Sequence, residues 1–197
     1  MKSSLGLGLA AAVLLGLGAL VLPAGAARAA SATDCASVGM DFADAEAEKK
    51  CQDGDASGSQ WRGSEQIMVV KGPGYFIYLR RLKSGYQSYI MDEDVRDFAD
   101  SFAKDIFQSS SPVSGHAVVS GYNVATFSGK LAESPHPEVD CFAFTRYGGV
   151  VVGARGGFSG APGTANGLYG GYCAKRGKGI SDASILHILS ELRAPVD

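Results

Sequence analysis

Residues 140–147, DCFAFTRY, alternate between the two faces of an extended chain. One face carries Cys141, Ala143 and Thr145, and the other carries Phe142, Phe144 and Arg146. Alternation with period two predicts a β-strand with a buried face. The stretch LYGGYCA, residues 168–174, predicts a second strand, and its Cys173 could form a disulfide with Cys141. The two stretches therefore predict neighbouring strands of one sheet, held together covalently.

The first thirty residues have the pattern of a signal peptide. A basic start, Met1-Lys2, precedes an apolar run from Leu5 to Leu22, and Ala27-Arg28-Ala29 matches a signal-peptidase cleavage site. The alternative is a retained membrane anchor, because the apolar run is just long enough to span a bilayer. Glycines inside the run and the small residues at the cleavage site favour cleavage. We expect residues 1–29 to be removed and residues 30–197 to form one exported domain, periplasmic or secreted, with no transmembrane segment.

Four cysteines lie in the expected mature domain: Cys35, Cys51, Cys141 and Cys173. An even number of cysteines in an exported chain favours two disulfides over a metal site. No two of them have the C-x-x-C spacing that is typical of zinc sites or thioredoxin-like redox sites. Three pairings are possible, and proximity in the sequence favours Cys35 with Cys51 and Cys141 with Cys173. Each such loop is expected to stabilise the fold by roughly 3–4 kcal/mol.

The other expected elements are helices and runs of strands. Helix-forming residues predict a short helix over Phe42–Cys51, and the amphipathic stretch DEDVRDFADSFAKDIF predicts a helix over residues 92–107 with Asp92 as its N-cap. A last helix is expected from Asp182 to Arg193, with Ile185, Leu186, Leu189 and Leu192 on its core face. Further strands are expected at 65–70, 75–82, 86–91, 116–129 and 149–154.

Strands that occur in runs, rather than in strict alternation with helices, indicate an α+β fold. We expect a single antiparallel sheet of about five to seven strands, with two or three helices packed mainly on one face and the disulfides as staples. No internal repeat or linker divides residues 30–197.

Charge is distributed unevenly along the mature chain. Removing Lys2 and Arg28 leaves 18 − 2 = 16 cations against 20 anions, a net charge of −4. Residues 34–65 hold eight acids and three cations, whereas residues 141–180 hold five cations and no acid. The candidate ligand-binding residues are these five cations and an aromatic neighbour: Arg146, Arg155, Lys175, Arg176, Lys178 and Tyr172. They predict a basic face that would attract an anion. The alternative is that acidic and basic segments pack together and cancel.

The stretch GYCAKRGKG, residues 171–179, raises the question of a phosphate-binding loop. The P-loop pattern requires glycine at position 172 and a hydroxyl residue at position 179, where the chain has Tyr172 and Gly179. A turn next to a disulfide, with its cations in water, is the better interpretation.

Residues 53–65, DGDASGSQWRGSE, resemble part of a calcium loop. Asp53, Asp55 and Ser57 match ligand positions one, three and five. The twelfth position, which should be a bidentate Glu, is Ser64. We therefore expect a polar turn, with Asp53 and Asp55 as weak calcium candidates and with no cofactor.

These features predict a binding or accessory module of the cell envelope rather than an enzyme. Its ligand would be an anionic glycan, a lipid headgroup or another envelope protein, and no nucleic-acid partner is expected. Two alternatives stay open. One is a small secreted hydrolase whose site is assembled from scattered residues, such as Ser159 and His136 with an acid. The other is a purely structural or protein-binding module.

Overall fold

The computed structural model describes residues 31–57, 62–85, 90, 92–131, 138–151, 163–176 and 180–196. Its strands are β1 (Ser31–Thr33), β2 (Asp41–Phe42), β3 (Glu48–Ser57), β4 (Arg62–Gly72), β5 (Tyr75–Ser84), β6 (Phe107–Ser110), β7 (Ser114–Val119), β8 (Tyr122–Leu131), β9 (Glu138–Val151), β10 (Gly163–Lys175) and β11 (Leu192–Arg193). Its helices are α1 (Cys35–Val38), α2 (Val95–Ile106) and α3 (Asp182–Glu191). The expected signal peptide lies outside the described residues.

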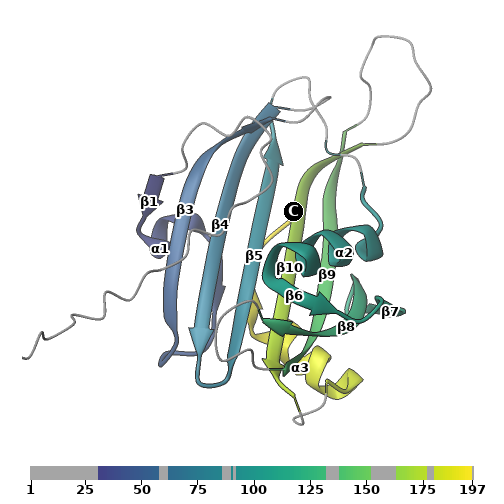
Figure 1. The fold of residues 1–197 in the computed structure, drawn as a ribbon. Coiled ribbons are helices and arrows are strands. Elements are labelled where there is room, and N and C mark those ends of the chain that lie inside the picture. The colour runs from purple at the N-terminus through teal and green to yellow at the C-terminus, as the bar shows by residue number, and fades with distance from the viewer. Residues whose placement is uncertain are drawn as a thin grey trace, which may run out of the picture.

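Nine strands form the main sheet, in the order β1-β3-β4-β5-β10-β9-β8-β6, with β7 also paired to β8. All of these pairings are antiparallel, as expected. Figure 1 shows β5, β10 and β9 side by side in the middle of the sheet. The sheet is larger than expected. One reason is that β3 includes residues for which the sequence predicts the end of a helix and a polar turn.

The expected strands at 65–70 and 75–82 are confirmed as β4 and β5, and the stretch 116–129 forms the two strands β7 and β8. The stretch 149–154, which the sequence predicts as either a hairpin partner or a bent continuation of 140–147, continues β9 as far as Val151, the last residue of the stretch that the structure describes. Of the strand expected at 86–91, the structure describes only Ile90, which bridges to Thr164. The residues with strong period-two alternation therefore form the strands that they predict.

Both expected disulfides are present in the structure. Cys141 and Cys173 lie directly opposite each other on β9 and β10, and their Cα atoms are 4.2 Å apart. Cys35 and Cys51 join α1 to β3, with Cα atoms 5.1 Å apart. The pairing that proximity in the sequence favours is therefore confirmed.

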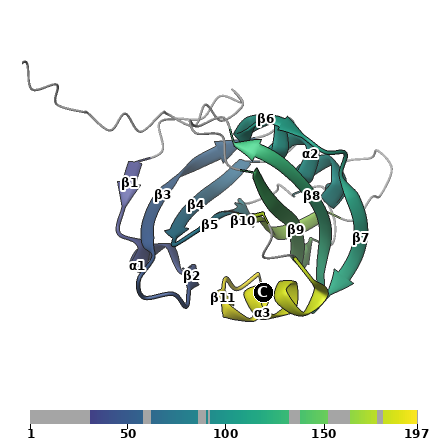
Figure 2. The ribbon, with the colours of Figure 1, turned by 60° about the horizontal axis from the view of Figure 1, so that its bottom comes forward.

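Alternation along β9 sends side chains into two separate apolar layers. Phe142 and Phe144 pack in one cluster with α3, whereas Cys141 and Ala143 pack in a second cluster with α2. Figure 2 shows the sheet curving around α3 and the β2–β11 pair, so this side of the sheet is concave. The expectation that the helices pack mainly on one face was wrong. Because the middle strands are apolar on both faces, each face needs its own covering layer.

The segment 42–51 does not form the helix that its composition predicts. It turns after β2 and enters β3, where Cys51 lies opposite Met68 of β4. Half-buried Lys49 and buried Cys51 flank exposed Lys50, which is the period-two pattern of a strand. Helix propensity is a weak preference, and pairing with β4 overrides it here.

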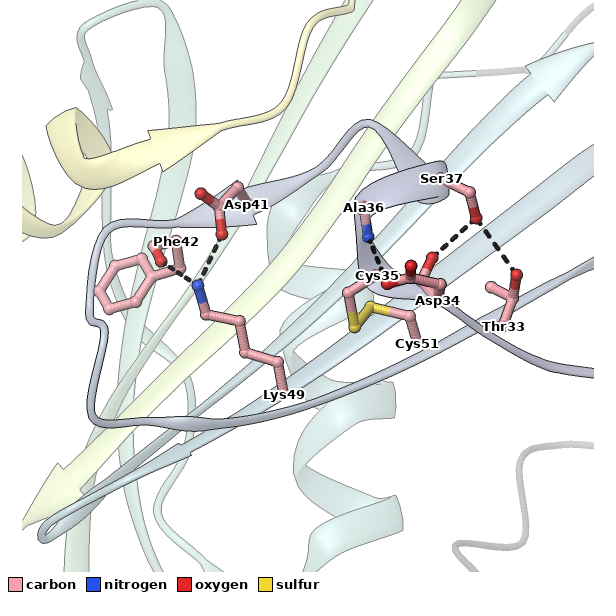
Figure 3. Close-up of a disulfide and its surroundings, with 9 residues drawn as sticks. All are labelled: Thr33, Asp34, Cys35, Ala36, Ser37, Asp41, Phe42, Lys49 and Cys51. Atoms are coloured by element: carbon pink, nitrogen blue, oxygen red, sulfur yellow. Dashed lines mark hydrogen bonds and ion pairs between the residues drawn. A yellow bond between two sulfur atoms is a disulfide. The ribbon is translucent and has the colours of Figure 1, made fainter.

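Helix α1 begins next to the first disulfide. The side chain of Asp34 accepts a hydrogen bond from the N–H of Ala36 at 3.1 Å and so caps the helix. Figure 3 shows this cap beside the bond between Cys35 and Cys51. The disulfide therefore holds a helix that is too short to be stable alone.

Helix α2 is the amphipathic helix that its sequence predicts. Its buried residues are Val95, Phe98, Ala99, Phe102 and Ala103. The N-cap is Asp94, whose side chain accepts a hydrogen bond from the N–H of Arg96 at 2.9 Å, and not Asp92 as expected.

Two glycines allow aromatic rings to pack against the middle strand β10. A Cβ at Gly170 would lie 2.2 Å from Phe144 Cζ, and a Cβ at Gly171 would lie 2.2 Å from Phe102 Cε1. Adjacent residues of a strand face opposite ways, so one ring covers the concave face and the other covers the convex face. The rings fill the space that glycine leaves.

Helix α3 and the chain after it close the concave side. The buried residues of the helix are Ile185, Ile188 and Leu189. Leu186, expected on the core face, is instead 48% exposed. Beyond the helix, β11 pairs with β2, and Ala194 and Val196 are buried in the same cluster as α3. The carbonyl of Val196 lies so close to Gly148 that a Cβ there would be 1.5 Å from it.

Candidate functional site

The predicted basic residues that the structure describes lie at two places along β9 and β10. Lys175 and Arg176 lie where β10 ends, whereas Arg146 pairs with β10 at Leu168. The seven steps from residue 168 to residue 175 span about 24 Å of strand. The structure therefore leaves Lys175 and Arg176 at one strand end, where Lys175 shares the convex face with its cross-strand partner Val139, and it does not bring Arg146 to them.

Arg146 and Tyr172 both contact aromatic rings of the concave face. The guanidinium carbon of Arg146 lies 5.2 Å from the centre of the Tyr122 ring, a cation–π contact. The half-buried ring of Tyr172 is stacked between Tyr75 at 5.6 Å and Phe142 at 5.5 Å. Because both faces of the Tyr172 ring are covered, only its edge can reach a ligand.

Lys175 and Arg176 are exposed at the lower end of the sheet in Figure 1, where β10 ends and β9 begins. Arg176 Nη1 lies 2.5 Å from Glu138 Oε2, and Lys130 Nζ lies 3.8 Å from Glu138 Oε1. Hydrogen bonding to Glu138 raises the pKa of Arg176, so the guanidinium stays charged. Among the described residues, Lys175 has no ion pair. The acid that pairs with Arg176 comes from β9 and not from the acidic segment 34–65.

An open pocket of about 160 Å³ lies at the same end of the sheet. Its lining residues are Ser114, Thr126, Phe127, Ser128, Asp140, Cys141 and Ile180. They come from β7, β8, β9 and the residue just before the N-cap of α3. Asp140 alternates in phase with Phe142 and Phe144, so its side chain is on the concave face. We call this feature the β8–β9 pocket.

Hydrogen bonds fix the polar groups of the β8–β9 pocket. Asp140 is half-buried, and its Oδ1 accepts a hydrogen bond from Ser128 Oγ at 3.0 Å. Within the described chain, Asp140 Oδ2 makes no hydrogen bond or ion pair. Thr126 Oγ1 donates to the carbonyl of Ser114 at 2.6 Å. Arg176 is close enough to Asp140 for electrostatic attraction, and this adds to the rise in the arginine pKa.

The expected polar turn at Asp53 and Asp55 is wrong, because both residues belong to strand β3. Gly54, between them, lies opposite Glu65 of β4. Cross-strand partners share a face, so Glu65 points away from the side on which the two aspartates lie. In the described ranges, no group of three or more His, Cys, Asp or Glu could hold a metal ion.

Four residues from the sequence-based hypotheses lie outside the described residues: Arg155, Lys178, Ser159 and His136. The β8–β9 pocket was not expected from the sequence. One signal for it exists, because Asp140 shares the alternation phase of Phe142 and Phe144. An acid next to two buried aromatic residues on the same face needs a polar partner or a solvent-filled space.

The fold and pocket define an α+β protein with a curved antiparallel sheet and two disulfides. Comparisons with models of protein families, with curated proteins and with solved structures find no match. Among the residues that the structure describes, no helix is long and apolar enough to cross a membrane.

Proposed function

We propose that this protein is an exported, non-enzymatic binding module of the cell envelope. It recognises an anionic component at the end of its sheet where β10 ends and β9 begins. The two disulfides fit an oxidising compartment. The observation that carries the proposal is the exposure of Lys175 and Arg176 where β10 ends, with Arg176 bonded to Glu138 on the side of the open pocket.

The charges at this end are available to a ligand. Lys175 makes no ion pair with any residue that the structure describes. Arg176 is paired with Glu138, but both side chains are more than 40% exposed, at 59% and 44%. Exposed ion pairs of this kind contribute little to stability because water and salt screen them. An incoming anion can therefore compete with Glu138 for the guanidinium of Arg176.

The test compares binding of the oxidised protein to three immobilised probes: polygalacturonate, polyacrylate and neutral dextran. Binding is measured at about 0.01 M and 1 M salt, where the Debye length is about 30 Å and 3 Å. We expect both anionic polymers to bind at low salt, dextran to bind more weakly, and high salt to weaken the anionic interaction.

The matched variants change the same kinds of charge at two places. Replacing both Lys175 and Arg176 with glutamine should weaken binding roughly tenfold, from two exposed charge contacts of about 0.7 kcal/mol each. The control replaces Lys104 and Arg96 of α2 with glutamine. Arg96, like Arg176, is exposed and paired with one acid, Asp94. An equal loss of affinity in both double variants, or an affinity that does not change with salt concentration, would refute the proposal.

A further inference from the structure

The geometry points to the β8–β9 pocket as a subsite for the hydroxyl groups of one sugar ring in an acidic glycan. This inference rests on the proposed function and names the class of ligand. It separates a glycan from a lipid headgroup, which would need the cations but not the pocket.

The volume of the pocket matches a single ring. It encloses about 160 Å³. An engineered protein cavity of about 150 Å³ holds one benzene molecule, so a six-membered ring fits a space of this size. The pocket is open, so the neighbouring units of a chain can continue outside it.

The polar groups of the pocket act mainly as hydrogen-bond acceptors. The hydroxyl proton of Ser128 is used on Asp140 Oδ1, and the hydroxyl proton of Thr126 is used on the carbonyl of Ser114. The lone pairs of both hydroxyl oxygens and the Oδ2 atom of Asp140 remain as acceptors. The pocket therefore complements a group that donates hydrogen bonds.

The charges then decide which donor fits. A phosphate or carboxylate inside the pocket would meet the negative charge of Asp140 and find too few donors. An ammonium group would be attracted by Asp140 but repelled by Arg176, which interacts electrostatically with the same carboxylate. A neutral hydroxyl group donates a hydrogen bond without either conflict.

The rest of the site supplies what a sugar ring needs besides hydroxyl contacts. Ile180 lines the pocket with an apolar side chain, which complements the C–H groups of a ring. Glu138 and Asp140 share a face of β9, so Arg176, through its bond to Glu138, lies on the pocket side of the strand ends. The ring enters the pocket, and the acidic group of the glycan binds to Arg176 outside it.

The experiment measures binding of the full oxidised protein to an array of acidic and neutral oligosaccharides, to polyacrylate and to phosphatidylserine vesicles. Polyacrylate carries negative charge but no hydroxyl groups. We expect Asp140→Asn to weaken glycan binding roughly 10- to 100-fold, the usual effect of losing a hydrogen bond to a charged group. Polyacrylate binding should not weaken. The control is Asp100→Asn, which removes one exposed carboxylate from α2.

Each outcome bears on a different claim. If Asp140→Asn binds glycans as tightly as Asp100→Asn, the inference is overturned, even if the cation variants still lose binding. The same holds if polyacrylate or the vesicles bind and no oligosaccharide does. Binding of neutral sugars alone, sensitive to Asp140→Asn, would support the pocket and refute the anionic ligand. Binding to none of the probes would overturn both claims.

Discussion

Replacing Gly171 with alanine tests how tightly α2 packs on the sheet. The added Cβ would lie 2.2 Å from Phe102 Cε1, whereas carbon atoms in contact are normally about 3.5–4.0 Å apart. The ring of Phe102 cannot move freely, because four aromatic rings surround it: Phe76, Tyr78, Phe98 and Phe127. Overpacking of this kind lowers the free energy of unfolding by about 1–3 kcal/mol. Alanine also restricts the unfolded chain more than glycine does, which raises the free energy of unfolding by about 0.4–1 kcal/mol. We expect a net loss of about 1–2 kcal/mol.

The assay is equilibrium unfolding in urea of Gly171→Ala, Phe102→Leu and the double variant. Leucine at position 102 removes the ring edge that the new methyl group meets. The two changes should therefore couple by about 1 kcal/mol, so that Gly171→Ala costs less in the Phe102→Leu background. Gly74→Ala is the control: its φ is +83°, nothing lies within 4 Å of its Cβ, and its cost should not depend on residue 102. A neutral Gly171→Ala variant, or an equal cost in both backgrounds, would refute the reasoning.

Two further predictions concern stability. Replacing Cys141 and Cys173 with alanine should lower the free energy of unfolding by about 3.7 kcal/mol from the loop entropy alone, and denaturant titration of oxidised protein checks this; a loss below about 1 kcal/mol would contradict it. Lys49 Nζ donates a hydrogen bond of 2.6 Å to Asp41 Oδ1 (Figure 3), and this hydrogen bond lowers the pKa of the carboxyl. Asp41→Asn should therefore cost under about 1 kcal/mol at neutral pH. The bond to Lys49 stabilises the fold only while the carboxyl is ionised. The difference in the free energy of unfolding should therefore shrink as the pH falls below about 4 and vanish below the lowered pKa of Asp41; a difference that persists in acid would contradict this.

The parts of the fold that the sequence predicts correctly have strong local patterns. The alternation in 140–147 specifies β9, and the 3.6-residue repeat of 92–107 specifies α2. The disulfide partners are also close in sequence, and the shorter loops are the ones that form. These patterns depend only on residues that are near one another in the sequence, so they can be recognised without knowing which segments pair in the fold.

Other parts depend on contacts between distant segments. Residues 48–57 have weak local preferences, and their pairing with β4 determines their structure. Likewise, Arg146 and Lys175 are on neighbouring strands, but antiparallel pairing puts Arg146 opposite Leu168 in the middle of β10, whereas Lys175 is at the end of β10. The β8–β9 pocket combines residues from Ser114 to Ile180, and only the folded sheet brings them together.

The pairing of β11 with β2 has a consequence for cooperativity. Val196 is buried in the same cluster as Val38, Met40 and Phe42, so this core joins segments from near both ends of the described residues. Opening either segment would expose the concave core to water, so we expect the two segments to exchange their amide hydrogens as one cooperative unit.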